Sequence, residues 1–296
     1  MNHINLHMHS SHSMDGEYSE KQLIDIALQQ KIKVISITDH NSVKAYQNIG
    51  HTINLSLVPG IEMDCHFQGK EFHLLGYGID VHDPVYEQIE QDITKQEQEC
   101  SQKRLSLIKE NLRLEIDEEK LKEVSPFGIY VPETICEIAI KDKRNQTNPY
   151  LQPYFPQGES SNNPDVNLDW DFCSQGKITY TKINYISMED AISIYHKQGG
   201  IAVVAHPGNN VKEDLQLMED IRHLGIDGIE VYSSYHTQEQ IAFYHKVCQK
   251  YQLIETAGSD FHDKTKPNVS MGLCHMPKEQ EEMLIKTMLS LKSRRT

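Results

Sequence analysis

Short apolar runs alternate with amphipathic stretches over two separate parts of the chain. The runs lie at positions 4–6, 34–38, 55–58, 201–205, 228–231 and 254–257 and are rich in β-branched residues. Between them apolar residues recur every three or four positions, as at Leu23, Ala27 and Leu28 after the N-cap candidate Ser19. These two periods predict strands and helices in alternation. Strands separated by helices pack as a mostly parallel sheet, so the pattern predicts an α/β fold.

One segment departs from this alternation. Residues 63–67 and 71–76 are joined by Gln68-Gly69-Lys70. Two strand-like runs around a short turn that contains glycine predict a β-hairpin, and its second arm carries His73.

The middle of the chain changes character from about Pro84. Residues 85–114 carry one apolar stripe on a heavily charged background, which predicts a long solvated helix. Shorter helices are predicted over 117–124 and 131–140, and the polar, Asn- and Pro-rich stretch 144–176 is typical of a long surface loop. The sequence therefore predicts a discontinuous domain, residues 1–83 and 186–296, interrupted by a mainly helical insert or cap at 84–185.

Composition and charge narrow the class of protein. The 296 residues are 38% hydrophobic and 24% charged, as in ordinary globular proteins. No apolar run is long enough to span a bilayer and the first residues lack the order of a signal peptide, so we expect a cytoplasmic protein with no membrane partner. Six cysteines without a C-x-x-C pair are expected to be free thiols. The net charge of −14 argues against binding long nucleic acid.

Histidines and acidic residues recur where the predicted strands end. Each position alone is equally compatible with an ordinary cap or turn residue. Taken together, nine such positions favour a metal site, because the carboxyl ends of parallel strands meet at one edge of the sheet. The nine candidates are six imidazoles and three carboxylates: His7, His9, Asp15, His40, Glu62, His73, His206, Asp260 and His262.

This set of ligands predicts the kind and number of ions. Imidazole and carboxylate without thiolate suit Zn, Mn or Fe. Nine ligands are too many for one ion and fit two or three divalent ions, with Glu62 as the candidate for a shared, bridging carboxylate. Three divalent ions would bring six positive charges against three carboxylates, so the pocket would attract a phosphate group even on an acidic protein.

The ions also predict a chemistry. Divalent metals lower the pKa of bound water to about 7 in favourable sites, so a hydroxide that bridges two ions can act as the nucleophile. His236 is a candidate catalytic residue that would bind the phosphate or protonate the leaving oxygen, and the alternative is that it only supports its neighbours. Lys182 is a candidate substrate contact, although a solvated charge is the simpler interpretation.

Six motifs, in order and spacing, resemble those of the PHP (polymerase and histidinol phosphatase) family. They are H-M-H-S-S-H-S-M-D-G, T-D-H-N, P-G-I-E, F-H-L-L-G-Y, V-A-H-P-G and G-S-D-F-H, within about residues 3–80 and 186–265. The resemblance implies a distorted (β/α)7 barrel, a trinuclear metal centre and phosphoester hydrolysis. It places His7, His9, Glu62 and Asp260 on one ion; Glu62, His73 and His206 on the second; and Asp15, His40 and His262 on the third.

The insert resembles that of bacterial members acting on nucleoside 3',5'-bisphosphates and short oligonucleotides. We therefore expect a metal-dependent phosphomonoesterase with a small nucleotide-like substrate. The alternatives are a 5'-to-3' exonuclease on short RNA or DNA, a histidinol phosphatase, and a metal-stabilised binding module without activity. Two features depart from the family pattern: Met14 adds a residue before Asp15, and Tyr130-Val131-Pro132-Glu133 stands where nucleotide-acting members carry Arg-Pro-His.

Overall fold

The computed structural model describes residues 2–47, 49, 55–262 and 269–293. Its contacts divide the chain into two compact units, one formed by Met1–Ile89 with Tyr185–Thr296 and the other by Glu90–Asn184. Each unit has its own buried apolar residues: two hydrophobic clusters lie in the first unit and one in the second. The division falls inside a single long helix, between Ile89 and Glu90.

The strands of the first unit form two sheets. The smaller is parallel and contains β1 (Ile4–Asn5), β2 (Val34–Ile35) and β3 (Ser56–Leu57) in that order. The larger has the order β6 (Ile186–Ser187), β4 (Gly60–Phe67), β5 (Lys70–Tyr77), β7 (Ile201–Val204), β8 (Gly228–Ser233) and β9 (Ile254–Gly258). The α/β class is confirmed.

The larger sheet is mixed: the predicted hairpin is confirmed, and it makes the centre of the sheet antiparallel, while the other strand pairs are parallel as expected. β5 runs antiparallel to both β4 and β7. The hairpin turn has positive φ at Gln68 (49°) and Gly69 (75°), the geometry that matches the twist of a two-residue hairpin. As a consequence, Glu62 and His73 lie within strands and not at strand ends.

Backbone hydrogen bonds join the two sheets at two places. After β1, Leu6 N donates to Ala257 O and His9 N donates to Phe261 O, each at 3.0 Å. After β2, the Glu62 N–H donates to Asp39 O at 3.2 Å and Asn41 N donates to Glu62 O at 2.8 Å. Within the described residues the strands are assigned to two sheets and a closed barrel is not detected.

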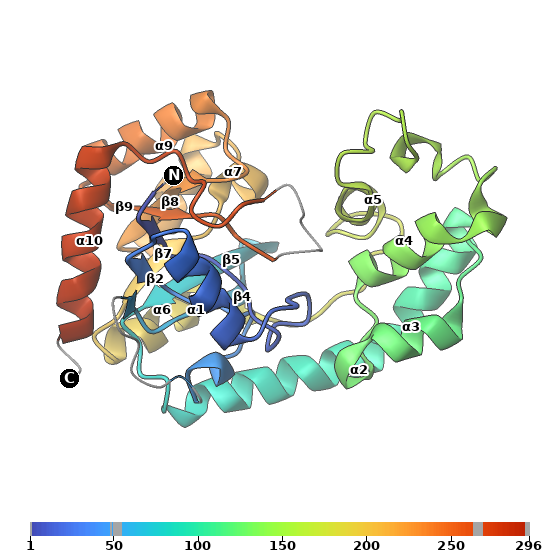
Figure 1. The fold of residues 1–296 in the computed structure, drawn as a ribbon, viewed down its shortest axis with the longest axis horizontal. Helices are drawn as coiled ribbons and strands as arrows, with labels where there is room; N and C mark the ends of the chain where they lie inside the picture. The colour runs from blue at the N-terminus through green and yellow to red at the C-terminus, as the bar shows by residue number, and fades with distance from the viewer. Residues whose placement is uncertain (1, 48, 50–54, 263–268, 294–296) are drawn as a thin grey trace. The chain divides into compact units, whose positions relative to one another are not determined.

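Helices surround the strands of the first unit (Figure 1). They are α1 (Glu20–Gln29), α6 (Met188–Lys197), α7 (Pro207–Asn210), α8 (Leu215–His223), α9 (Gln238–Tyr251) and α10 (Lys278–Ser293). Ser19 caps α1 in a capping box with Gln22, and Ser187 caps α6 by accepting the Asp190 N–H. In the described part of the chain, no helix combines the length and apolar character needed to cross a membrane.

The second unit is helical. Its helices are α2 (Pro84–Leu112), which begins in the first unit, α3 (Glu118–Val124), α4 (Pro132–Lys141) and α5 (Pro164–Phe172). The expectation of a continuous loop over 144–176 is wrong at α5. This helix has Pro164 at its start, a position where the missing N–H costs nothing.

The core of the second unit can be tested apart from the first. Ile135 on α4 is fully buried in that core, whereas Ile178 in the same unit is 61% exposed. We expect Ile135→Ala to lower the free energy of unfolding by about 2–4 kcal/mol, because it leaves a cavity. Ile178→Ala should change it by less than about 0.5 kcal/mol. Denaturant unfolding measures both, and equal effects would contradict a packed insert core.

Candidate metal centre

All nine predicted side chains lie together in the first unit. Their imidazole nitrogens and carboxylate oxygens fall into groups whose atoms are within 4.8 Å of one another. Three groups contain the nine residues: His7, His9, Glu62 and Asp260; Glu62, His73 and His206; and His9, Asp15, His40 and His262. A fourth group contains His40, His73 and Asp64, a residue that was not predicted.

The first group has the spacing of ligands around one ion. His7 Nε2 lies 2.9 Å from Glu62 Oε2 and 3.2 Å from Asp260 Oδ1. The corresponding distances from His9 Nε2 are 3.1 and 2.9 Å. Two ligands bound about 2.1 Å from a shared ion lie roughly 3–3.5 Å apart. His9 Nε2 is buried and, within the part of the chain that the structure describes, forms no hydrogen bond despite these near neighbours, so the residues fit a cation.

Glu62 faces two groups at once. Its Oε2 approaches His7 and His9, as described above, while its Oε1 lies 3.1 Å from His73 Nδ1 and 3.2 Å from His206 Nε2. The side chain is fully buried. An unpaired carboxylate is costly in such a place, and one oxygen directed at each group is the arrangement of a bridging ligand.

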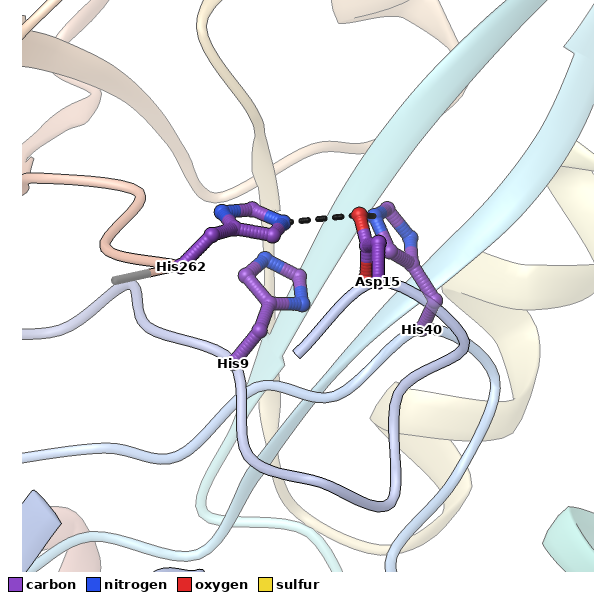
Figure 2. Close-up of side chains that lie close together, drawn as sticks. All are labelled: His9, Asp15, His40 and His262. Atoms are coloured by element: carbon purple, nitrogen blue, oxygen red, sulfur yellow. Dashed lines mark ion pairs between the residues drawn. The ribbon is translucent and has the colours of Figure 1, made fainter. Parts of the chain in front are cut away.

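The third group is drawn in Figure 2, where His9 and Asp15 come from the loop after β1, and His40 and His262 come from two other parts of the chain. Asp15 Oδ2 lies 2.8 Å from His262 Nε2 and 3.9 Å from His40 Nε2. The rings of His9 and His262 stack with centroids 4.0 Å apart. Asp15 therefore reaches this group although Met14 lengthens its loop.

Hydrogen bonds fix which nitrogen several of these histidines present. His7 Nδ1 donates to Glu230 Oε1 at 3.0 Å, and His262 Nδ1 donates to the Asp260 carbonyl oxygen at 2.9 Å. In both residues Nε2 is then the nitrogen that carries the lone pair. A partner of this kind orients a metal ligand and increases its basicity.

Glu230 is a residue of the site that sequence reasoning missed. It is fully buried on β8, and its second oxygen accepts the backbone N–H of His206 at 2.8 Å. A side chain on Gly258 would place Cβ 2.2 Å from His7 Cβ and 2.4 Å from Glu230 Oε1. Only glycine therefore allows this contact between His7 and Glu230. A carboxylate inside the apolar strand Gly228–Ser233 was the signal in the sequence.

Burial and neighbouring charges shift the pKa values of several side chains in these groups. Burial raises the pKa of the Glu62 carboxyl, but His7, His40 and His73 outweigh this and hold it well below its ordinary value. Burial, with His262 and His40, lowers the pKa of His9 to about 4, so that its ring is neutral near pH 7. Burial raises the pKa of Asp39 to about 6 against the hydrogen bonds that Ser10 donates to it.

The two substrate candidates lie outside these groups. His236 is 9% exposed, its Nδ1 donates to Val231 O at 2.9 Å and its Nε2 accepts the Gly208 N–H at 3.0 Å. These bonds give it a role in holding the segment after β7. Lys182 lies in the second unit, where it lines a pocket with Asp92 and Glu99. The catalytic role of His236 and the substrate contact of Lys182 stay predictions.

The model of the PHP domain family matches residues 5–199, about two thirds of the chain. The chain belongs to the PHP domain family. A solved structure from Bifidobacterium adolescentis, described as a putative metal-dependent phosphoesterase, has the same fold with a TM-score of 0.72. It is 18% identical, and the match covers 97% of this chain and 96% of that one.

Three relatives align along most of their length. A phosphoribosyl 1,2-cyclic phosphate 1,2-diphosphodiesterase of Eggerthella lenta is 26% identical over 88% of this chain and 94% of its own. A 5'-3' exoribonuclease of Haemophilus influenzae is 26% identical over 87% and 89%. A 3',5'-nucleoside bisphosphate phosphatase of Chromobacterium violaceum is 24% identical over 88% and 88%.

Metal binding should depend on pH with a definite sign. Burial lowers the pKa of His7, but Glu62, Glu230 and Asp260 outweigh it and raise this pKa well above 6.5. At His40 and His73, too, nearby carboxylates outweigh the effect of burial and raise the pKa of the ring. Protonated rings stabilise the metal-free protein at low pH, and this stability is lost as pH rises through the raised pKa values.

A cation competes with those protons, so metal affinity should increase as pH rises. We expect the difference in Tm between metal-loaded and chelator-treated protein to grow from pH 6 to pH 9. Calorimetry in buffers of different ionisation enthalpy should detect proton release on metal binding. A difference in Tm that does not change with pH, without proton release, would contradict ligation by these histidines.

Proposed function

We propose that the chain is a metal-dependent phosphoesterase that releases phosphate from a phosphomonoester of a small nucleotide-like substrate at a two- or three-metal site. The observation that carries the proposal is Glu62, whose two oxygens approach two different imidazole groups at 2.9–3.2 Å. Membership of the PHP domain family supports it.

The names of the three relatives support the substrate class. One acts on a phosphoribosyl cyclic phosphate, one is an exoribonuclease and one acts on nucleoside bisphosphates. The substrates in these names are phosphoric esters of ribose or of nucleosides. A phosphorylated ribose is what these substrates have in common, which supports a small nucleotide-like substrate, and short RNA is the second candidate because of the exoribonuclease.

The proposed ligands are the nine side chains of the three groups. When bound, Zn, Mn or Fe ions would supply positive charge to the phosphate and lower the pKa of a water molecule. The chain's own contribution is orientation. Glu230 holds His7, the Asp260 carbonyl holds His262, and the burial of His7, His9 and Glu62 excludes bulk water from the base of the site.

We also propose that the two sheets together make a distorted seven-stranded barrel. The order around it would be β1, β2, β4, β5, β7, β8 and β9. Strand pairing runs from β4 through β5, β7 and β8 to β9. The backbone hydrogen bond of Leu6 links β1 to β9, and that of Glu62 links the end of β2 to β4. Such a ring would bring the segments that carry the proposed metal ligands to one rim.

Two further parts of the proposal concern surroundings. The six cysteines, which all lie among the described residues, are free thiols, and this fits a reducing compartment such as the cytoplasm.

The segment 84–185 is proposed as a cap that contributes to substrate choice, because the Arg-Pro-His element of nucleotide-acting family members is replaced there by Tyr130-Val131-Pro132-Glu133.

A phosphate-release screen tests the proposal. Metal-loaded protein should release phosphate from a nucleoside 3',5'-bisphosphate, with histidinol phosphate and aryl phosphate as comparison substrates. Asp260 has a φ of 52°, a conformation that asparagine tolerates, so Asp260→Asn removes the charge without backbone strain. We expect kcat/KM to fall by more than about 100-fold, because this residue approaches both His7 and His9.

The matched control is Asp25→Asn on the exposed face of α1, which should keep wild-type activity. A ladder of shortened products from 5'-labelled oligonucleotides, with no release from bisphosphates, would support the exonuclease instead. If metal-loaded protein hydrolysed none of these substrates but its Tm rose with metal, a metal-stabilised binding module would replace the enzyme.

A further inference from the structure

Asp64 stands on the same face of the β4–β5 hairpin as the proposed metal ligands. It follows Glu62 by two residues on β4, and side chains two apart on a strand share a face. In the antiparallel register its direct partner on β5 is His73. Directly opposed side chains have their Cβ atoms about 5 Å apart, so Asp64 and His73 are neighbours by construction.

Asn41 fixes the orientation of Asp64. Asn41 Nδ2 donates to Asp64 Oδ2 at 2.6 Å, and the Asp64 N–H donates to Asn41 Oδ1 at 3.0 Å. Asn41 is itself held, since its backbone N donates to Glu62 O at 2.8 Å, and it has a φ of 56°. With Oδ2 committed to Asn41, the other oxygen of Asp64 has a defined direction.

That second oxygen lies between two imidazoles. Asp64 Oδ1 is 3.3 Å from His40 Nδ1 and 3.4 Å from His73 Nε2. It is buried, and among the described residues it has no other hydrogen-bond partner. Both distances are slightly longer than a well-formed N–H···O bond, so a small rotation of either ring completes one.

The nitrogen of His73 near Asp64 is turned away from Glu62, because His73 presents its other nitrogen, Nδ1, to Glu62 Oε1 at 3.1 Å. His40 Nδ1 lies between Asp64 Oδ1 and Glu62 Oε2, which is 3.6 Å away, and His40 presents its other nitrogen, Nε2, to Asp15 at 3.9 Å. A carboxylate that accepts the N–H of one ring nitrogen leaves the lone pair on the other. It also makes the imidazole a stronger metal ligand.

We propose that Asp64, oriented by Asn41, is a positioning residue that fixes the ring orientation and tautomer of His40 and His73, and thereby couples the second and third metal groups. The inference rests on the proposed metal-dependent function. Asp64 acts through the two histidines and does not touch the substrate.

The competing interpretation is that Asp64 binds an ion directly. His40, His73 and Asp64 meet the same distance condition as the other groups. The two interpretations differ in the number of ions bound at saturation, because loss of a ligand for a further ion removes that ion. Loss of a positioning residue only weakens the affinity of the ions already present.

Two variants and one control separate the cases. In Asp64→Asn, the amide donor of Asn41 will hold the new carbonyl oxygen, so the new NH₂ group turns toward ring nitrogens that need an acceptor. Asn41→Gly keeps the positive φ and removes the buried side chain that contacts Asp64. Asp25→Asn removes an acidic charge from the exposed face of α1.

The measurements are elemental analysis at saturating zinc, zinc affinity by chelator competition, and ¹⁵N NMR of the histidine ring N–H groups in zinc-loaded protein. We expect Asp64→Asn to bind as many ions as wild type. If three ions bind, the affinity for two of them should be about 10–100-fold lower, and if two ions bind, the affinity for the weaker one should be lower by this factor. The slowly exchanging ring N–H signals of His40 and His73 should be lost. Asn41→Gly should show a smaller loss of affinity, and Asp25→Asn none.

Three results would overturn the inference. Asp64→Asn binding one ion fewer at saturation would make Asp64 a direct ligand. Unchanged affinity and unchanged ring N–H signals in both variants would remove any role for Asp64. An equal loss of zinc affinity in Asp25→Asn would show that the change in net charge, and not the position of Asp64, causes the loss. The proposed function fails separately, if wild-type protein binds no ions or releases no phosphate.

Discussion

The central constraint of this structure is the close packing of imidazole nitrogens and carboxylate oxygens in a buried place. Glu62, His7 and His9 are almost fully enclosed, and their ligand atoms lie about as close as hydrogen-bond distance without a complete set of hydrogen bonds. Buried polar groups of this kind are costly unless each finds a partner. Divalent cations, as proposed, would satisfy the whole set at once and would explain why these residues converge from segments that are far apart in the sequence.

The scaffold holds that arrangement through a second layer of contacts. Glu230 joins His7 to the backbone of His206, and Gly258 allows the approach because a Cβ there would collide with both partners. Asn41 ties the segment after β2 to β4 and orients Asp64. These contacts place ligands from the parallel and the antiparallel parts of the sheets in one site, so the fold and the chemistry depend on the same hydrogen bonds.

The nine candidate ligands could be selected from the sequence, because the histidine-rich motifs keep their order and spacing, and the structure brings their side chains together. The sequence was insufficient for Glu230 and Asp64. Glu230 lies inside an apolar strand, where the sequence alone does not show what it contacts. Asp64 lies in a predicted hairpin, where an acidic residue is ordinary. Their roles depend on the register between strands, which the pattern of a single strand does not contain.

The same limit explains the errors in the fold. The hairpin was predicted, but its first strand begins at Gly60 and not at residue 63, so Glu62 lies inside β4 and His73 inside β5, and neither is at a strand end. Helix α5 was missed because the Asn- and Pro-rich residues around it dominate the composition.

Anomalous diffraction from crystals grown with saturating zinc or manganese tests the central claim most directly. The account predicts at least two strong peaks about 3.5–4 Å apart, with Glu62 between them. A single peak, or peaks elsewhere in the molecule with the nine side chains unchanged, would contradict it.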